Sequence, residues 1–526
     1  MNRVGDIILS IGFFVMLWAC GNLDYATVLS VAPYLNETTA TLIGLLLLGG
    51  AMSKSAQLPL QTWLPDRMEG PTPVSALIHA ATLVTRGVYL MLRSTPLLEY
   101  GPTTLIVITW LGAFTALFRA SVGLVQSDIK KTIAFSTCSQ LGYMFIAVGI
   151  SQYEVALFHL VNHAMFKALL FLAAGSVLHA MSDQQDMRRL GGLVGFLPLT
   201  YVSILIGSLS LMALPGLTGY YSKDAILELG AAWYTFSGSG VYWLGTLAAG
   251  ATAFYSIRLI CLTFLVTPTG PKKSYETTHE ASYEVVVALI ILSILSIVFG
   301  YLASDLFHGM GTDFLTSSCY VHPNNRVSVE SHFRVPTFYK ILPSLVTLFG
   351  GLSAFIVYHF TPEFITDITL SRIGQKVYAF LANQWRWNGL ITGGILSPAL
   401  SLGLIISKSI DRGSIERCGP YGLSRVVSNT GRSVAVYDTS LVTSYALYIM
   451  LGLLTLMLII FGPSLLFGGS IYTASSDISL YLIFLAGISL LNSSNRNRPL
   501  SFDKNIHLRL YYICIPQISP QIIHPS

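Results

Sequence analysis

The sequence predicts an all-α membrane protein, a bundle of transmembrane helices. Of its 526 residues, 53% are hydrophobic and 10% are charged, and the mean hydropathy is +0.64, whereas soluble domains carry about 25% charged residues. Apolar runs of about 20 residues recur, each long enough to cross a hydrocarbon core of about 30 Å as a helix. Runs such as LIGLLLLGGAM and LYIMLGLLTLMLIIF lack the alternation of barrel strands.

Eleven candidate spans follow one another along the chain, and a twelfth, at 476–492, is marginal. The eleven cover residues 6–22, 42–65, 73–93, 103–126, 129–149, 154–180, 196–231, 240–266, 283–304, 339–360 and 438–463. Two of them are interrupted, and each interruption stands beside a lysine, Lys54 or Lys223. The interrupting residues are Pro59 and Pro65 in the first case and Pro215, Gly216 and Gly219 in the second. Such breaks free backbone groups that lipid cannot satisfy, and paired breaks are typical of ion paths in transporters.

The chain changes character after residue 304. A polar connection, 303–336, precedes a lone span and then a section, 364–434, that is moderately apolar but rich in arginine and lysine. This section fits a membrane-surface helix and equally a loop with short helices. The tail after residue 493 is polar and predicts an extended segment.

Basic residues indicate the orientation. If the spans alternate, the loops DIKK (128–131), DMRR (186–189) and GPKK (270–273) share one side with the amino terminus. By the positive-inside rule, that side is the cytoplasm or the mitochondrial matrix.

The sequence offers little for a cofactor. The six cysteines form no CxxC pair, HLVNH (159–163) lacks the glutamate of a zinc helix, and no glycine-rich phosphate motif is present. We therefore expect no cofactor, no metal site and no redox centre in this chain.

The stretch FHLVNHAMFKALLFL, residues 158–172, holds His159, His163 and Lys167 four residues apart within an apolar run. Each step of four turns a helix by about 40°, so the three side chains form a slanting stripe about 12 Å long. A lysine in the bilayer interior costs at least about 2.5 kcal/mol, and both residue types can exchange protons near neutral pH. The stripe favours a proton path over the alternative, in which these groups only hydrogen-bond helices together.

Other ionisable candidates stand in other spans. Lys54 and Lys223 flank the two breaks, His79 lies in the third span, and Asp224 adjoins Lys223. Asp6, at the start of the first span, could pair with one of them, but the sequence alone favours a position facing the interface.

These residues belong to motifs that resemble a known family. The motifs are NRVGD (2–6), KSAQLPLQTWLPDRMEGPTPVSALIHAATLVT (54–85), DIKKTIAFSTCSQLGYM (128–144), FHLVNHAMFKALLFLAAGSVLHAM (158–181), QDMRRLGGL (185–193) and LTGYYSKDAILE (217–228). They resemble the chain 5 family of NADH:ubiquinone oxidoreductase, respiratory complex I, whose relatives include the Mrp-type sodium/proton antiporters. SIERCGPYGLS (414–424) favours the mitochondrial forms.

The resemblance implies a proton-pumping subunit of the membrane arm, coupled to quinone reduction elsewhere in the complex. It implies two inverted repeats with a broken helix in each, a lateral amphipathic helix, and residence in the inner mitochondrial membrane with that helix on the matrix side. It also implies a proton path through Lys54, His79, His159, His163, Lys167 and Lys223, supported by Asp6 and Asp224.

The resemblance further divides the chain into six parts. They are the remainder of the first repeat (1–102), the second repeat (103–270), additional helices with the polar connection (271–363), the lateral helix (364–434), a terminal membrane anchor (435–465) and a carboxyl-terminal extension (466–526).

The family usually carries further helices before the NRxGD motif, one of which holds a glutamate that pairs with the lysine matching Lys54. Here the motif begins at Asn2. We therefore expect the carboxyl-terminal piece of a split subunit, with Lys54 lacking its acid until a separate chain supplies the missing helices. Other expected partners are the remaining membrane-arm subunits and lipids, with no nucleic acid. The alternatives are a standalone cation/proton antiporter and a structural subunit without a working path.

Overall fold

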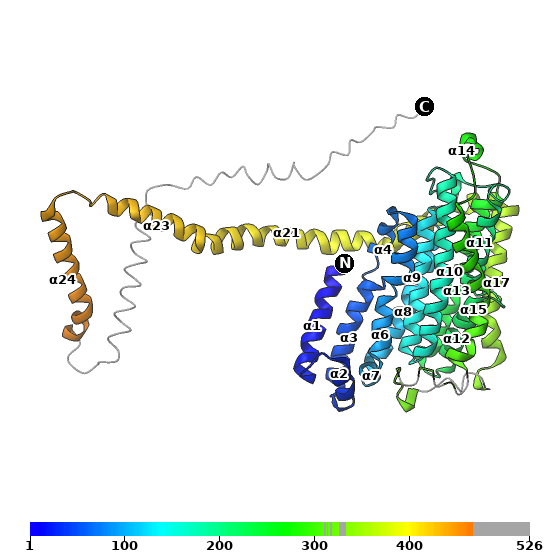
Figure 1. Ribbon diagram of the computed structural model, residues 1–526, viewed down its shortest axis with the longest axis horizontal. Coiled ribbons are helices and arrows are strands. Elements are labelled where there is room, and N and C mark those ends of the chain that lie inside the picture. The colour runs from blue at the N-terminus through cyan, green and yellow to red at the C-terminus, as the bar shows by residue number, and fades with distance from the viewer. Residues whose placement is uncertain (310–311, 313, 316–317, 326–332, 467–526) are drawn as a thin grey trace. The chain divides into compact units, whose positions relative to one another are not determined.

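Helices make up most of the part of the chain that the structure describes. This computed structural model describes residues 1–309, 312, 314–315, 318–325 and 333–466, and every element within them is a helix (Figure 1). The all-α prediction is confirmed. Two compact units are distinguished, Met1–Leu390 and the residues from Ile391 onward, and each is described by itself.

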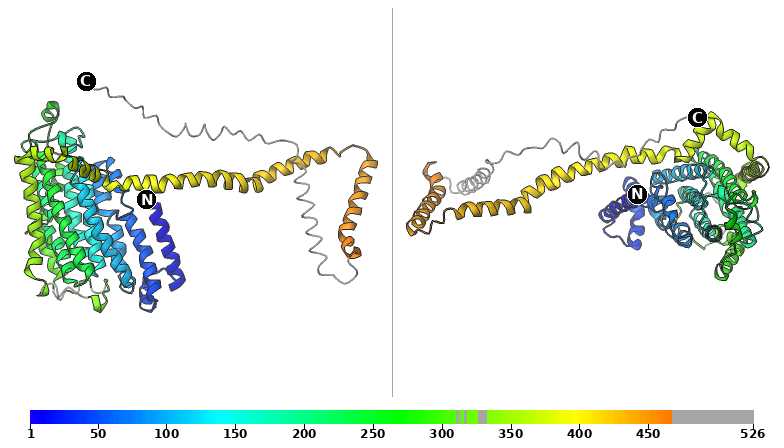
Figure 2. Two further views of the ribbon diagram at one scale, coloured as in Figure 1. Left: turned by 180° about the vertical axis from the view of Figure 1, so that it is seen from behind. Right: turned by 90° about the horizontal axis from the view of Figure 1, so that it is seen from above.

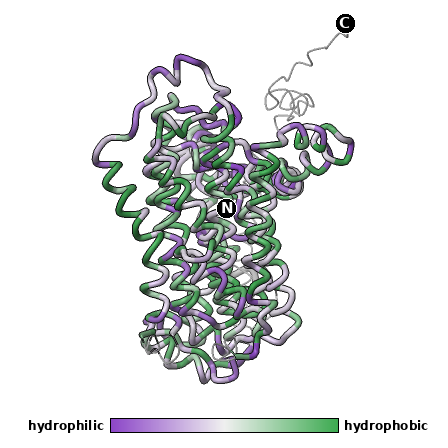
Figure 3. The backbone as a smooth tube through the Cα atoms, turned by 90° about the vertical axis from the view of Figure 1, so that its right-hand side faces the viewer, coloured by the Kyte–Doolittle hydropathy of each residue, from purple (hydrophilic) through white to green (hydrophobic). Residues whose placement is uncertain are grey.

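Long helices run side by side in the first unit (Figures 1 and 2). They are α1 (Asn2–Cys20), α3 (Glu37–Lys54), α8 (Pro102–Gly123), α9 (Ile129–Gly149), α10 (Tyr153–Ala180), α11 (Pro198–Met212), α12 (Thr218–Ala232), α13 (Phe236–Ile260), α15 (Tyr283–His308) and α17 (Thr337–Phe355). A further long helix is formed by α5 (Thr72–Val74), η3 (Ser75–Thr82) and α6 (Arg86–Arg93), and η5 (Cys261–Leu265) continues α13. Shorter helices include α2 (Tyr25–Val31), α4 (Trp63–Asp66), α7 (Thr95–Glu99) and α14 (Lys272–Glu276). Hydrophobic residues line the long helices, and hydrophilic residues gather in the loops at both ends (Figure 3).

Ten helical stretches among the described residues are long and apolar enough to cross a membrane. All but one coincide with predicted spans, and the exception, Gln384–Cys418, lies within the section 364–434. The two predicted spans missing from the ten are the interrupted ones, 42–65 and 196–231. The marginal span at 476–492 lies outside the described residues.

Helix α9 lies at the centre of the first unit. Its apolar window is entirely buried, and it packs closely against α8 through two glycines. A Cβ atom at Gly112 would come within 2.6 Å of the Gly142 carbonyl oxygen, and one at Gly142 within 2.7 Å of the Gly112 carbonyl oxygen. Small residues of this kind let helix backbones approach each other in membranes, so polar side chains on α9 are held away from lipid.

The first predicted break is present. Helix α3 ends at Lys54, and α4 begins only at Trp63. Pro59 lies in the non-helical stretch between them, whereas Pro65 lies inside α4, so the prolines do not act together as predicted.

The second break separates α11 from α12. Ala213 and Gly216 adopt positive φ angles of 67° and 89° there. Gly219, predicted to be part of the break, instead lies in the first turns of α12. A Cβ atom at Gly219 would come within 1.7 Å of the Ser210 carbonyl oxygen, so this glycine allows the two half-helices to approach closely.

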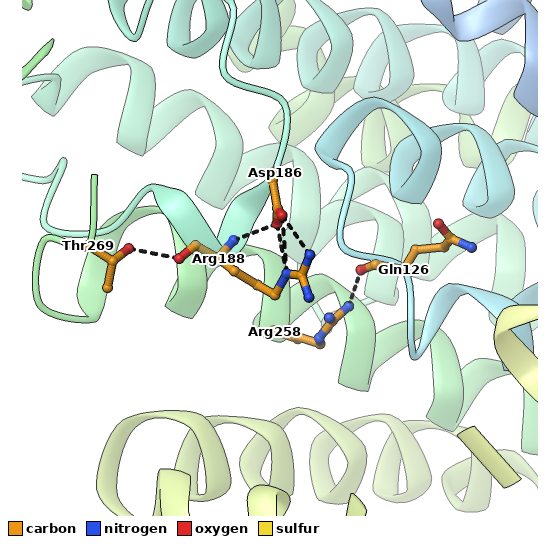
Figure 4. Close-up of polar contacts among 5 residues, drawn as sticks. All are labelled: Gln126, Asp186, Arg188, Arg258 and Thr269. Carbon is orange, nitrogen blue, oxygen red and sulfur yellow. Dashed lines mark hydrogen bonds and ion pairs between the residues drawn. The ribbon is translucent and has the colours of Figure 1, made fainter. Parts of the chain in front are cut away.

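The three basic loops meet at one end of the first unit, as predicted. The Ile129 amide donates to the Gln185 carbonyl at 3.1 Å, and the Met187 amide donates to the Ser127 carbonyl at 2.9 Å. The Thr269 hydroxyl donates to the Arg188 carbonyl at 2.9 Å (Figure 4). The amino terminus lies at the same end as α14 (Figure 1).

Two aspartates organise these loops. Asp128 caps α9 by accepting bonds from the backbone amides of Lys130 and Lys131, and burial raises the pKa of its carboxyl. Asp186 binds the Arg188 guanidinium at 2.7 Å (Figure 4), and that guanidinium lowers the pKa of the Asp186 carboxyl.

The predicted surface section is helical over most of its length. The first unit ends with η7 (Ile356–Phe360), α18 (Pro362–Leu370), α19 (Arg372–Ala382), η8 (Gln384–Arg386) and α20 (Trp387–Gly389). The residues that follow form η9 (Leu390–Leu396), α21 (Ser397–Ile406), η10 (Ser407–Ile415), α22 (Glu416–Cys418), α23 (Pro420–Ala435) and α24 (Val442–Leu466). The helical content favours the surface helix over a loop, while its lateral orientation stays a prediction.

Candidate functional site

Lys54 forms an ion pair at the edge of the first unit. Its Nζ lies 2.7 Å from Oδ1 of Asp6, and the two side chains are 24% and 41% exposed. Helices α1 and α3 approach closely there, since a Cβ atom at Gly5 would come within 1.9 Å of the Ser53 hydroxyl. The expectation that Asp6 simply faces the interface was therefore wrong, because Asp6 is an acid partner of Lys54 within this chain.

His79 lies next to the first break. It is buried in the π-helical segment η3, and insertions of this type often occur at functional sites. The Trp63 ring stands edge-on to His79, with 6.4 Å between ring centroids, and the Trp63 indole donates to the Ser53 carbonyl at 2.8 Å. Trp63 therefore joins His79 to the residue beside Lys54.

His159 connects three helices. Its Nδ1 lies 2.9 Å from the Ser222 hydroxyl of α12, and its Nε2 lies 3.1 Å from Oε1 of Gln140 on α9. The ring is fully buried. Because the Gln140 carbonyl oxygen can only accept a hydrogen bond, Nε2 of His159 carries a proton, and Nδ1, which faces the Ser222 hydroxyl, is the nitrogen that can gain or lose one.

His163 and Lys167 continue the stripe along α10. The rings of His159 and His163 lie 6.4 Å apart, centroid to centroid. Neither ring nitrogen of His163 has a hydrogen-bonding partner among the described residues, which suits a group whose partner is internal water. The Lys167 ammonium donates to the Ser136 hydroxyl and, at 3.4 Å, to the Ile133 carbonyl.

Lys223 lies beyond His159. Its ammonium donates to the Thr252 hydroxyl at 2.9 Å and lies 5.2 Å from the centroid of the Tyr143 ring. The side chain is 1% exposed. Its neighbour Asp224 has a different partner, since it accepts a bond from the Ser344 hydroxyl at 2.9 Å.

The resemblance orders the path as His159, His163, Lys167 and then Lys223, and one contact shows where α12 meets this stripe. Ser222, the residue before Lys223 on α12, binds His159. Lys167 stands at the other end of the stripe, although its charge also interacts with that of Lys223.

Three residues that were not predicted link the stripe to its surroundings. Ser136, Gln140 and Tyr143 lie on α9 with spacings of four and three residues, which places them on one face. Each contacts a member of the stripe or Lys223. A polar face on the most buried helix was the signal that could have revealed them.

Two cavities open near opposite ends of the first unit. The larger, about 850 Å³, lies at the loop end between α10 and the segment after α4; we call it the Lys130 cavity. It reaches Leu172, five residues along α10 from Lys167, and its charged or ionisable lining comprises Glu69, Lys130, His179, Asp183, His279 and Glu280. The second, about 380 Å³, is the Asp224 cavity, where Asp224, Glu228, Asp305 and His308 gather.

The arrangement forms an interrupted line of protonatable groups across the first unit. It runs from the Lys130 cavity through Lys167, His163 and His159 to Lys223, and the Asp224 cavity adjoins its far end. Lysines and histidines are residue types that can exchange protons near neutral pH.

Two family models match the chain. Residues 1–248 match the transmembrane family described as NADH:quinone oxidoreductase/Mrp antiporter, and residues 324–461 match the NADH dehydrogenase subunit 5 carboxyl-terminal family.

Among solved structures, an Mrp complex from Dietzia sp. aligns with a TM-score of 0.59 and 22% identity, over 97% of this chain and 60% of that chain. An archaeal membrane-bound sulfane sulfur reductase aligns with a TM-score of 0.51 and 20% identity, over 68% of this chain and 66% of that chain. The fold and the buried stripe define a multi-pass membrane subunit of the antiporter-like class.

Curated relatives narrow this class. The chain is 59% identical to NADH-ubiquinone oxidoreductase chain 5 of Cryptococcus neoformans var. grubii, over 94% of this chain and 74% of that protein. It is 60% identical to the protein of the same name from Mycosarcoma maydis, over 87% of this chain and 68% of that protein. The chain belongs to the NADH-ubiquinone oxidoreductase chain 5 family.

Proposed function

We propose that this chain is a proton-translocating subunit in the membrane arm of NADH:ubiquinone oxidoreductase, the respiratory complex I of the inner mitochondrial membrane. The observation that carries the proposal is the buried line from Lys167 to Lys223, which lies between two cavities at opposite ends of the first unit. Enclosed lysines and histidines are costly in a membrane protein and typically mark proton relays.

Proton transfer would follow the hydrogen bonds. Lys167 receives a proton from the side of the Lys130 cavity and passes it through His163 and internal water to His159. His159 transfers it through the Ser222 hydroxyl toward Lys223, and Lys223 releases it toward the Asp224 cavity. No electron carrier is needed in this chain, because oxidation of NADH and reduction of quinone would take place in other subunits.

The pair of Lys54 and Asp6 would control this transfer electrostatically. Two unit charges about 8 Å apart interact by about 2 kcal/mol at an effective dielectric constant near 20. Opening or closing the ion pair, driven from a neighbouring subunit, therefore changes the field along the path.

Partners and orientation belong to the same proposal. The basic loops face the matrix, and the lateral section lies on that side with them. A separate chain supplies a carboxylate beside Lys54 and covers α1, whose exposed apolar residues Ile7, Ile11, Phe14 and Trp18 recur every three or four positions. An intact complex in which no such hydrophobic chain contacts α1 would contradict this part of the proposal.

Proton pumping in complexes carrying Lys167→Met tests the function. We expect the ratio of protons pumped to electrons transferred to fall, while the complex still assembles and oxidises NADH. Lys272→Met is the matched control, because Lys272 is 92% exposed at the loop end and pairs only with Glu276 in the described chain. An unchanged ratio in an assembled Lys167→Met complex would refute the proposed path.

A further inference from the structure

A cationic cavity lies beside α19, away from the proton path. It measures about 530 Å³ and is lined by Gln375, Lys376, Ala379, Phe380, Asn383 and Arg386. Two of these side chains are cations, two are amides that can donate hydrogen bonds, and none is a carboxylate. The cavity therefore suits an anionic group with several acceptor oxygens.

An unusual turn brings Arg386 to this cavity. Gln384, Trp385 and Arg386 have consecutive φ angles of 52°, 56° and 58°, a conformation that costs about 1–3 kcal/mol for each such residue. The surrounding structure holds the turn in place. Oε1 of Gln384 accepts a bond from Nη1 of the fully buried Arg119 at 3.2 Å, and the Trp385 indole donates to the Ser121 hydroxyl at 3.2 Å.

Aromatic packing fixes the wall of the cavity that carries Phe380. The Trp385 ring stacks on Phe380 with 5.7 Å between centroids and stands edge-on to Phe118 of α8 at 5.0 Å. The wall that carries Phe380 and the turn that carries Arg386 are thus locked to the same helix. The positions of Lys376 and Arg386 around the cavity are set before any ligand binds, which lowers the entropic cost of binding.

Helix α19 is amphipathic and lies at the loop end. Ile373, Val377 and Phe380 are 77%, 50% and 42% exposed, and Tyr378 interacts electrostatically with Arg188 of the basic loops. A basic helix that exposes apolar residues is typical of the membrane interface, where lipid headgroups meet acyl chains. Charge and amphipathicity together favour a lipid over a soluble anion.

We propose that the α19 cavity binds the phosphate of one anionic phospholipid. Lys376 and Arg386 pair with the phosphate oxygens, Gln375 and Asn383 donate further hydrogen bonds, and the acyl chains lie against the exposed apolar residues of α19. Such a lipid adds a further contact to a turn that Arg119 and Ser121 already hold in place.

Lipid crosslinking to the assembled complex tests this site. The probe is phosphatidylglycerol with a photoreactive group next to the phosphate, and crosslinked peptides from residues 373–386 are quantified by mass spectrometry across a titration. We compare the unaltered complex with Lys376→Gln, Arg386→Gln and the double variant. Arg372→Gln is the control, because Arg372 carries a charge on the same helix but does not line the cavity.

We expect each substitution to weaken binding about fivefold and the double variant to weaken it about 30-fold, the fold-changes that correspond to about 1 kcal/mol for each charge. Arg372→Gln should change binding less than twofold, and photoreactive phosphatidylcholine should crosslink poorly. Equal crosslinking in the double variant would overturn the proposal. Displacement of the probe by millimolar inorganic phosphate would assign the site to the free anion and also overturn it. NADH oxidation in each variant verifies assembly.

Discussion

The two interrupted helices carry lysines in opposite electrostatic surroundings. Lys54 is the last residue of α3, where the negative end of the helix dipole favours a cation, and Asp6 neutralises it. Lys223 lies in the second turn of α12, near the positive end of the dipole, and among the described residues its ammonium contacts a hydroxyl and an aromatic ring but no carboxylate. The two interrupted helices therefore place their lysines in different electrostatic environments.

The difference suggests a division of labour. A lysine with an acid partner at a helix carboxyl terminus holds its charge well, whereas a buried lysine with only neutral partners holds its charge at a cost. In the proposed mechanism, Lys54 is a fixed charge whose pairing changes, and Lys223 is a group that gains and loses a proton.

Loss of Lys223 should have the largest effect. Lys223→Met removes a group that exchanges protons, so transfer through this chain should fall at least about 100-fold, the scale of general acid–base contributions. The ratio of protons to electrons in reconstituted vesicles measures this loss. Tyr301→Phe, on the exposed side of α15, is a control that should leave the ratio unchanged.

Disruption of the ion pair should have a smaller effect. Asp6→Asn leaves Lys54 without its partner in this chain, and because both side chains are partly exposed we expect pumping to slow about tenfold or less, which corresponds to at most about 1.4 kcal/mol. The swapped variant Asp6→Lys with Lys54→Asp should recover part of the rate. A double-mutant cycle without coupling between the two positions would exclude a role for the pair.

Loss of the hydrogen bond between Ser222 and His159 should slow pumping less than loss of the ion pair does. Ser222→Ala removes one neutral hydrogen bond to His159, worth about 1 kcal/mol, so pumping should slow about fivefold. Ser222→Thr keeps the hydroxyl and should restore most of the rate. Equal rates for the alanine variant and the unaltered complex would show that the path does not use the hydrogen bond between Ser222 and His159.

The smallest effect concerns the loop end. Asp186→Asn weakens the bond to the exposed Arg188, so the loop should lose at most about 1 kcal/mol. Because Arg188 lowers the pKa of Asp186 in the folded chain, this contribution is present above the ordinary aspartate pKa and is lost only as the pH falls through the lowered value. Hydrogen exchange at the Met187 amide should therefore be faster in the variant at pH 6–8, with a difference that does not depend on pH in that range.

Local sequence patterns predict much of the fold. Spans such as 129–149 and 154–180 match their helices within a residue because long apolar runs have only one stable form in a membrane. Pro59 and Pro215 likewise indicate the breaks, since proline cannot donate a helical hydrogen bond. The roles of Pro65 and Gly219 were not predictable in this way, because each depends on where the helix resumes.

The site was harder to predict because it depends on packing between distant segments. His159, His163 and Lys167 share one helix, so their spacing reveals the stripe. The bond between Asp6 and Lys54 depends on the close approach of α1 and α3 at Gly5, and the contact of His159 with Ser222 depends on how α12 meets α10. Neither approach is encoded in the local pattern of either segment.

Arginine replacements test the division of labour most directly. Arginine keeps a positive charge and does not release its proton. We expect complexes with Lys54→Arg to retain most of their proton-to-electron ratio, and assembled complexes with Lys223→Arg to lose the protons carried by this chain. Normal pumping in an assembled Lys223→Arg complex would contradict the account.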